Sequence, residues 1–170
     1  GRRMKAVTFV EIDLDFCSLR HNRPPCMAAI EGDLIASTLW RFHDGAEGWA
    51  GGGASFDADD GFARLTTTSD NPIFQSPSSL TIDGSEYRYV RIDIEKIAER
   101  SSGTWDGRFL WSTGDHGFLN GYRLNFPEIT VAQGRQRILL DMSNVTSGGD
   151  DWITNTITRL RFDFDNGPDA

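Results

Sequence analysis

The sequence predicts an all-β protein, folded as an antiparallel β-sandwich with an N-terminal β arm. Apolar and polar residues alternate along several short stretches, which is the period-2 pattern of half-buried strands. Turns rich in Gly, Asp, Asn and Ser separate these stretches, as is typical of sandwiches. The 170 residues include 38% hydrophobic residues, 18 Gly, 5 Trp and 11 Phe, which suits a compact, turn-rich β protein better than a disordered chain or a helical bundle.

Residues 1–38 are expected to form the arm and a linker. The range 6–15 predicts a strand, because it is rich in β-branched and aromatic residues and is followed by the Pro-containing loop 18–25. We interpret 27–38 as the linker; a short helix interrupted at Gly32 is the alternative.

The two cysteines, Cys17 and Cys26, flank this loop. They are either two reduced thiols or one local disulfide with Pro24 and Pro25 at its neck, and we favour the disulfide. Together with His21 they are too few ligands for a structural zinc site.

Residues 39–170 are expected to form the sandwich as one domain. Its clearest strand is Tyr87–Ile94, where apolar and polar residues alternate, and the Asp83-Gly84 pair before it predicts a turn. Only the range 94–100 suggests a helical turn. Further strands are predicted at 62–68, 108–113, 122–126, 136–142 and 156–164.

The range 71–77 is extended but contains Pro72 and Pro77. Because proline cannot donate a hydrogen bond to a sheet ladder, we expect an edge strand or a connector there.

The charge balance argues against a nucleic-acid partner. The formal net charge is -8, and the basic residues are scattered apart from Arg2, Arg3 and Lys5. Binding to a phosphate backbone needs clustered Lys and Arg instead. No apolar run approaches the roughly 18 residues of a membrane-spanning helix, so no membrane span is expected.

The sequence shows no clear set of catalytic residues. Carboxylates are plentiful in the predicted loops, but no pair is singled out, and no nucleophile motif or phosphate-binding loop is present. We therefore expect no enzymatic activity, with a small glycosidase or lyase as the enzymatic alternative.

The range 8–19 followed by Pro25-Cys26 resembles the opening of minor structural proteins from the tail tip or hub of tailed bacteriophages. The shared features are Phe9-Val-Glu-Ile-Asp13 and Cys17-Ser18. This resemblance implies a virion structural protein whose N-terminal arm adds to the sheet edge of a neighbouring tail subunit.

A second resemblance spans residues 39–166. The chain is similar there to galactose-binding-like jelly rolls, as in the carbohydrate-binding modules beside bacterial polysaccharide-degrading enzymes. The resemblance implies a jelly-roll fold, glycan binding and a structural calcium ion. The motifs, in order, are Trp40-x-Phe42, Glu47-Gly-Trp49, Ser76-Pro77, Leu80-x-Ile82-Asp83, Tyr87-x-Tyr-Val90, Phe109-Leu-Trp111 and Ile157-x-x-Leu160-Arg-Phe-Asp163.

Aromatic residues in loops are the candidate platforms for a sugar, because the apolar face of a sugar ring packs on an indole. Aromatic residues on strands are expected in the core instead. For each Trp in a loop, a role as a lid over the core is as strongly expected as a role as a sugar platform. Trp49 is one loop candidate. The two candidate glycan sites are Trp105 and Asp106 with Asp115 and His116, and Asp150, Asp151 and Trp152.

For calcium, the resemblance implies a site near the first and last strands. Asp44, Glu47 and Asp163 are the matching positions, since Ca2+ takes carboxylate and carbonyl oxygens. The alternative is that these acids only cap turns.

Taken together, these features favour a non-catalytic module of a phage tail-tip, hub or tail-fibre protein that binds host-surface glycan or serves tail assembly. The alternative is a carbohydrate-binding module of a secreted polysaccharide-degrading enzyme. The expected location is the virion or the extracellular space.

Overall fold

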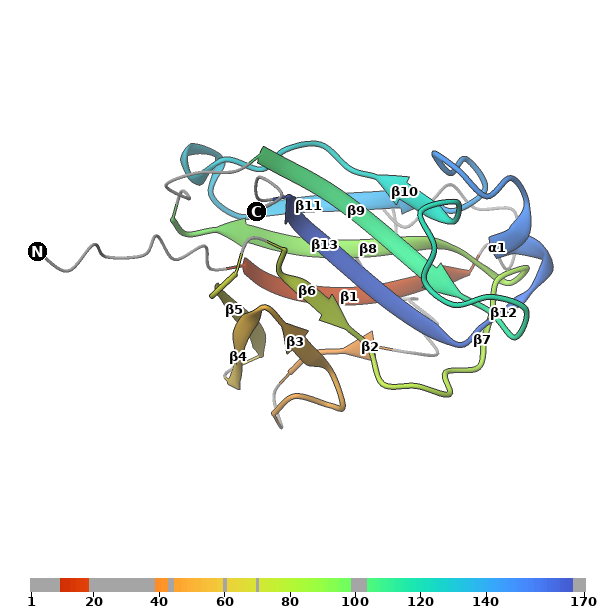
Figure 1. Cartoon of the computed structure of the whole chain (residues 1–170), viewed down its shortest axis with the longest axis horizontal. Helices are drawn as coiled ribbons and strands as arrows, with labels where there is room; N and C mark the ends of the chain where they lie inside the picture. Colours follow the sequence, from red (N-terminus) through yellow and green to blue (C-terminus); the bar gives the residue numbers. More distant parts are fainter. Residues whose placement is uncertain are drawn as a thin grey trace, which may run out of the picture.

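Two antiparallel sheets lie one behind the other and enclose an aromatic core (Figure 1), which confirms the predicted all-β sandwich. The fold is a computed structural model. It describes residues 10–18, 39–42, 45–59, 61–69, 71–98 and 104–166. For residues 10–18, 39, 59, 104, 165 and 166 it describes only the backbone.

Sheet A, the rear layer in Figure 1, has the order β11–β8–β1–β5–β4, with β2 paired to β1. Its longest strand is β8, which follows the tight turn after Asp83 as predicted. The strands are β1 (Val10–Ser18), β2 (Leu39–Trp40), β4 (Ala54–Asp59), β5 (Phe62–Thr67), β8 (Tyr87–Lys96) and β11 (Gln136–Asp141).

Sheet B, the front layer, has the order β10–β9–β13–β6–β3. A separate short ladder joins β7 (Ile82–Asp83) to β12 (Thr156–Ile157), and the two short helices are η2 (Val131–Gln133) and α1 (Asp151–Thr154). The strands of sheet B are β3 (Ala50–Gly52), β6 (Ile73–Gln75), β9 (Thr104–Ser112), β10 (Arg123–Asn125) and β13 (Arg159–Asn166).

The expected N-terminal arm lies inside sheet A. Strand β1 pairs with β8 along its whole length, and its other edge pairs with β5 and β2. Its register places Ile12 opposite Ile94 and Leu14 opposite Ile92. The backbone groups of a buried strand such as β8 need partners on both sides, and β1 supplies the partners on one of them. It is therefore an inner strand of sheet A rather than a separate arm.

Two local expectations were wrong. The range 71–77 is neither edge nor connector, because β6 lies between β13 and β3 with Pro72 and Pro77 just outside its paired residues. The helical turn suggested at 94–100 is absent from its described part, since β8 continues to Lys96.

The core consists of aromatic rings from both sheets and from the segments between them. Phe162 is fully buried and packs against Phe109, with ring centroids 4.8 Å apart, and against Phe164 at 5.8 Å. Trp49 stacks on Phe74 with a centroid distance of 4.4 Å. Trp49, a candidate platform, is thus a core residue, with 3% of its surface exposed.

Candidate functional site

One end of the sandwich is built by the connection 113–122 between β9 and β10, together with α1. The connection starts with a tight turn, in which Thr113 N donates to His116 O over 3.1 Å and Asp115 N donates to Thr113 Oγ1 over 3.2 Å. Helix α1 packs on the turn before β8, where Gly84 N donates to Asn155 O over 3.1 Å. A side chain at Gly84 would collide with the carbonyl of Trp152, so glycine is required there.

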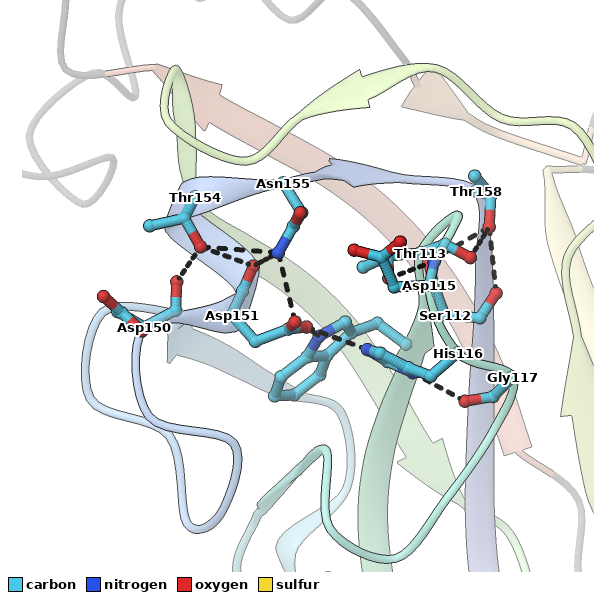
Figure 2. A network of polar contacts seen from close by, with 11 residues as sticks. Ser112, Thr113, Asp115, His116, Gly117, Asp150, Asp151, Thr154, Asn155 and Thr158 are labelled. Atoms are coloured by element: carbon cyan, nitrogen blue, oxygen red, sulfur yellow. Dashed lines mark hydrogen bonds and ion pairs between the residues drawn. The ribbon is translucent and has the colours of Figure 1, made fainter.

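The Asp151 carboxylate, from α1, is the centre of the polar network in Figure 2. Its Oδ2 accepts a hydrogen bond from Trp111 Nε1 over 2.7 Å and lies 3.0 Å from His116 Nε2. Its Oδ1 accepts from Asn155 Nδ2 over 3.1 Å. Both oxygens are therefore engaged within the protein.

The His116 ring is held from three sides. Its Nδ1 lies 2.8 Å from Gly117 O, and its face stacks on Tyr122 at a centroid distance of 3.6 Å. Both ring nitrogens thus face acceptors, so both contacts are hydrogen bonds only when the ring is doubly protonated, and the contact with Asp151 is then a salt bridge. With 6% of its side chain exposed, His116 clamps the connection to α1.

The candidate glycan sites are rearranged in the structure. His116 and Asp151, from different predicted groups, come together, whereas Asp115 is exposed next to them. Trp152 is fully buried and donates from Nε1 to Tyr87 O over 2.8 Å, so it is a core residue and offers no ring to a ligand. The side chain of Asp150 is exposed, and Asp150 contributes its carbonyl to α1.

Trp105 lies on β9 rather than in the expected loop. Its half-buried ring packs toward the core against Phe126 at 5.7 Å and Phe164 at 6.1 Å between centroids. Because neighbouring residues of a strand point to opposite faces, Asp106 lies on the outer face of sheet B, away from the His116 clamp.

That outer surface, which we call the sheet B face, carries a set of polar side chains. Phe74, Phe109, Leu124 and Phe162 point into the core, so the residues before and after them point outward. Cross-strand register puts these outward residues in rows. The set comprises Gln75, Asp106, Arg108, Arg123, Asn125, Arg159, Arg161 and Asp163.

Two carboxylates on the sheet B face are paired with arginines. Arg161 grips Asp163 through two hydrogen bonds of 2.5 and 2.8 Å, and Arg108 Nη2 lies 3.6 Å from the same carboxylate. Arg108 also contacts Asp106 and donates to Asn120 Oδ1 over 3.0 Å. The Asp163 side chain is only 2% exposed beneath these partners.

Arg159 and Phe118 form the other part of this surface. Arg159 Nη2 donates to Gln75 Oε1 over 3.1 Å. The Phe118 ring, from the connection 113–122, lies over both guanidinium groups, 5.1 Å from Arg159 Cζ and 5.9 Å from Arg161 Cζ. The connection therefore crosses the sheet B face, as seen in front of β9 in Figure 1.

Burial raises the pKa of Asp106, and the nearby Asp163 carboxylate raises it further, against the opposing effects of Arg108 and Arg123. The ionised form of Asp106 is thus disfavoured by its surroundings.

The residues expected to bind calcium, Asp44, Glu47 and Asp163, do not form a site within the described residues. Arg161 and Arg108 occupy the Asp163 carboxylate, Glu47 is exposed, and Asp44 lies outside the described residues. Within the part that the structure describes, no group of three or more His, Cys, Asp or Glu side chains is arranged to hold a metal ion. The Cys17–Cys26 disulfide also stays a prediction, because Cys26 lies outside the described residues.

Comparison with known proteins adds no relative: no protein-family model matches the chain, and no curated protein matches it. Among the described residues, no helix is long and apolar enough to cross a membrane.

Proposed function

We propose that the protein is a non-catalytic module of a larger assembly, namely a phage tail-tip, hub or tail-fibre component, and that its sandwich binds host-surface glycan. The resemblance of the first 26 residues supports the virion context. The observation that carries the binding function is the set of planar polar side chains on the sheet B face, where the Phe118 ring lies against Arg159 and Arg161.

A glycan ligand suits this chemistry. Sugar hydroxyls take hydrogen bonds from amide and guanidinium groups, which Gln75, Asn125 and Arg159 supply from three different strands. The apolar face of a sugar ring packs on an aromatic ring, and Phe118 is the half-buried aromatic residue beside Arg159. The other candidate rings, of Trp49, Trp105 and Trp152, pack in or against the core.

Binding is better supported than hydrolysis. A glycosidase uses two carboxylates that both reach the scissile bond. Asp106 and Asp163 are the described carboxylates on the sheet B face, and Asp163 is covered and gripped by Arg161. A substrate could therefore reach at most Asp106, which leaves the second catalytic role unfilled.

Retention of the protein on a glycan array tests this proposal. Phe118→Ala should abolish retention, because the ring would be lost from the sheet B face. Leu119→Ala is the matched control, since the neighbouring Leu119 side chain is 54% exposed. Retention on no glycan at all, or equal retention of Phe118→Ala and wild type, would refute the binding function.

A carbohydrate-binding module of a secreted polysaccharide-degrading enzyme would use the same surface. The two contexts differ in their expected gene neighbourhood. A phage component should be encoded among tail-assembly genes, whereas a module of a secreted enzyme should be encoded among hydrolase genes. In either context, the module acts on the virion or outside the cell.

A further inference from the structure

We infer that the sheet B face selects glycans that carry carboxylate groups, such as chains of uronic acids. This inference rests on the proposed glycan-binding function and names its ligand class. It follows from the charge of the surface and from the partners of its arginines.

The sheet B face has the opposite charge to the whole chain. Its described strand side chains include four arginines, at positions 108, 123, 159 and 161, and two aspartates, at positions 106 and 163. The whole chain has a formal net charge of -8. The local excess of positive charge attracts anions to this surface, while the acidic remainder of the protein repels them.

The excess charge belongs to two specific arginines. Arg161 and Arg108 are neutralised by Asp163 and Asp106, as described above. The hydrogen-bond partners of Arg159 and Arg123 in the described structure are neutral instead, although Arg123 also acts on the Asp106 carboxylate through its charge. Arg159 bonds to the Gln75 amide and lies under Phe118, and Arg123 bonds to the Asn125 side chain and the Asn120 carbonyl.

Arg159 is the better placed of the two for a ligand. Its Nε is buried and has no hydrogen-bond partner in the described part of the chain. A partly buried guanidinium without a counter-charge is unfavourable. Because Nε itself is buried, a carboxylate would reach this guanidinium at its Nη1 and Nη2 end, where its charge would remove the penalty. With Phe118 over the same guanidinium, a uronic acid would meet its carboxylate partner and an aromatic ring at one place.

A matched pair of polysaccharides tests the inference, namely polygalacturonate and its fully methyl-esterified form, which share a backbone and differ in charge. Affinity electrophoresis of the whole chain should show binding to polygalacturonate at least about tenfold tighter than to the ester, and this preference should fall as salt is added. Arg159→Gln should lose most of the preference. Arg88→Gln, which removes the same charge from sheet A, should keep it, since the Arg88 side chain bonds to Ser85 O.

The outcomes separate the two proposals. Equal binding to both polymers, or an unchanged preference in Arg159→Gln, would refute the selectivity for carboxylates and leave glycan binding intact. Absence of binding to these polymers and to every neutral glycan of the array would refute both.

Discussion

Nε2 of His116 lies 3.0 Å from Oδ2 of Asp151, 35 residues further along the chain. This contact ties the connection 113–122 to α1. Phe118 follows His116 by two residues and reaches over the sheet B face. The position of the proposed ligand-binding ring therefore depends on the contact between His116 and Asp151 at the base of its loop.

We expect Asp151→Ala to lower the free energy of unfolding by roughly 1–3 kcal/mol, because the buried Trp111 Nε1 loses its acceptor. Glycan affinity should also fall, although Asp151 is not on the sheet B face, because Phe118 would lose its support. Urea unfolding followed by Trp fluorescence, together with affinity electrophoresis, measures both effects. Asp150→Ala is the control, since the exposed Asp150 contributes only its carbonyl. Equal behaviour of the two variants would contradict the clamp.

Phe162→Ala should destabilise the protein by about 3–5 kcal/mol, the usual range for removing a fully buried ring. Phe162 contacts aromatic rings on both sides, so the cavity would lie at the centre of the sandwich. Leu119→Ala should change stability by less than about 0.5 kcal/mol, because that side chain is mostly exposed. Chemical denaturation of both variants checks this contrast, and a small effect of Phe162→Ala would show that the core is elsewhere.

The turn before β8 should depend on pH through Asp83. Ser85 donates to Asp83 Oδ1 from its hydroxyl over 2.6 Å and from its backbone N over 2.9 Å, and these bonds lower the pKa of Asp83. A lowered pKa in the folded state means that the ionised group stabilises the fold at neutral pH and that this stabilisation is lost as the pH falls. Because Asp83 is exposed and solvent screens its charge, Asp83→Ala should cost less than about 1 kcal/mol at neutral pH, and less still at acidic pH. Asp83→Asn, which keeps an acceptor but does not titrate, should show a smaller loss at neutral pH, and this loss should also shrink at acidic pH because the wild type loses the ionised group. A loss that grows on acidification would contradict this assignment.

Asp106 should behave in the opposite way. Its pKa is raised, chiefly by burial, so its contribution to stability is complete at low pH and is lost as the pH rises through the raised pKa. Asp106→Asn mimics the protonated acid and should be more stable than wild type at neutral pH, with no difference at acidic pH. Unfolding curves at the two pH values measure this. A variant less stable than wild type at neutral pH would mean that the contact with Arg108 outweighs burial.

Much of the fold could be predicted from the sequence because alternation is a local signal. The expected strands at 62–68, 87–94, 136–142 and 156–164 correspond to β5, β8, β11 and β12 with β13. The location of β1 could not be predicted, because alternation identifies a strand but not its neighbours.

The candidate site was predicted less well, for a related reason. Trp105 and Trp152 stand beside polar residues, which suggested exposed loops, but Trp105 extends β9 and Trp152 closes the core. The alternation of Arg159 and Arg161 with Leu160 and Phe162 could have indicated the sheet B face. Its proximity to Phe118 depends on how the connection 113–122 folds back, which no local pattern encodes.

The most direct measurement is a backbone amide NMR titration of the isotope-labelled whole chain with a short oligogalacturonate. If the sheet B face binds the ligand, the shifts should concentrate on β9, β13 and Gln75 and on the connection around Phe118. Shifts confined to sheet A, or to α1 and its neighbours, would contradict the sheet B face as the binding surface.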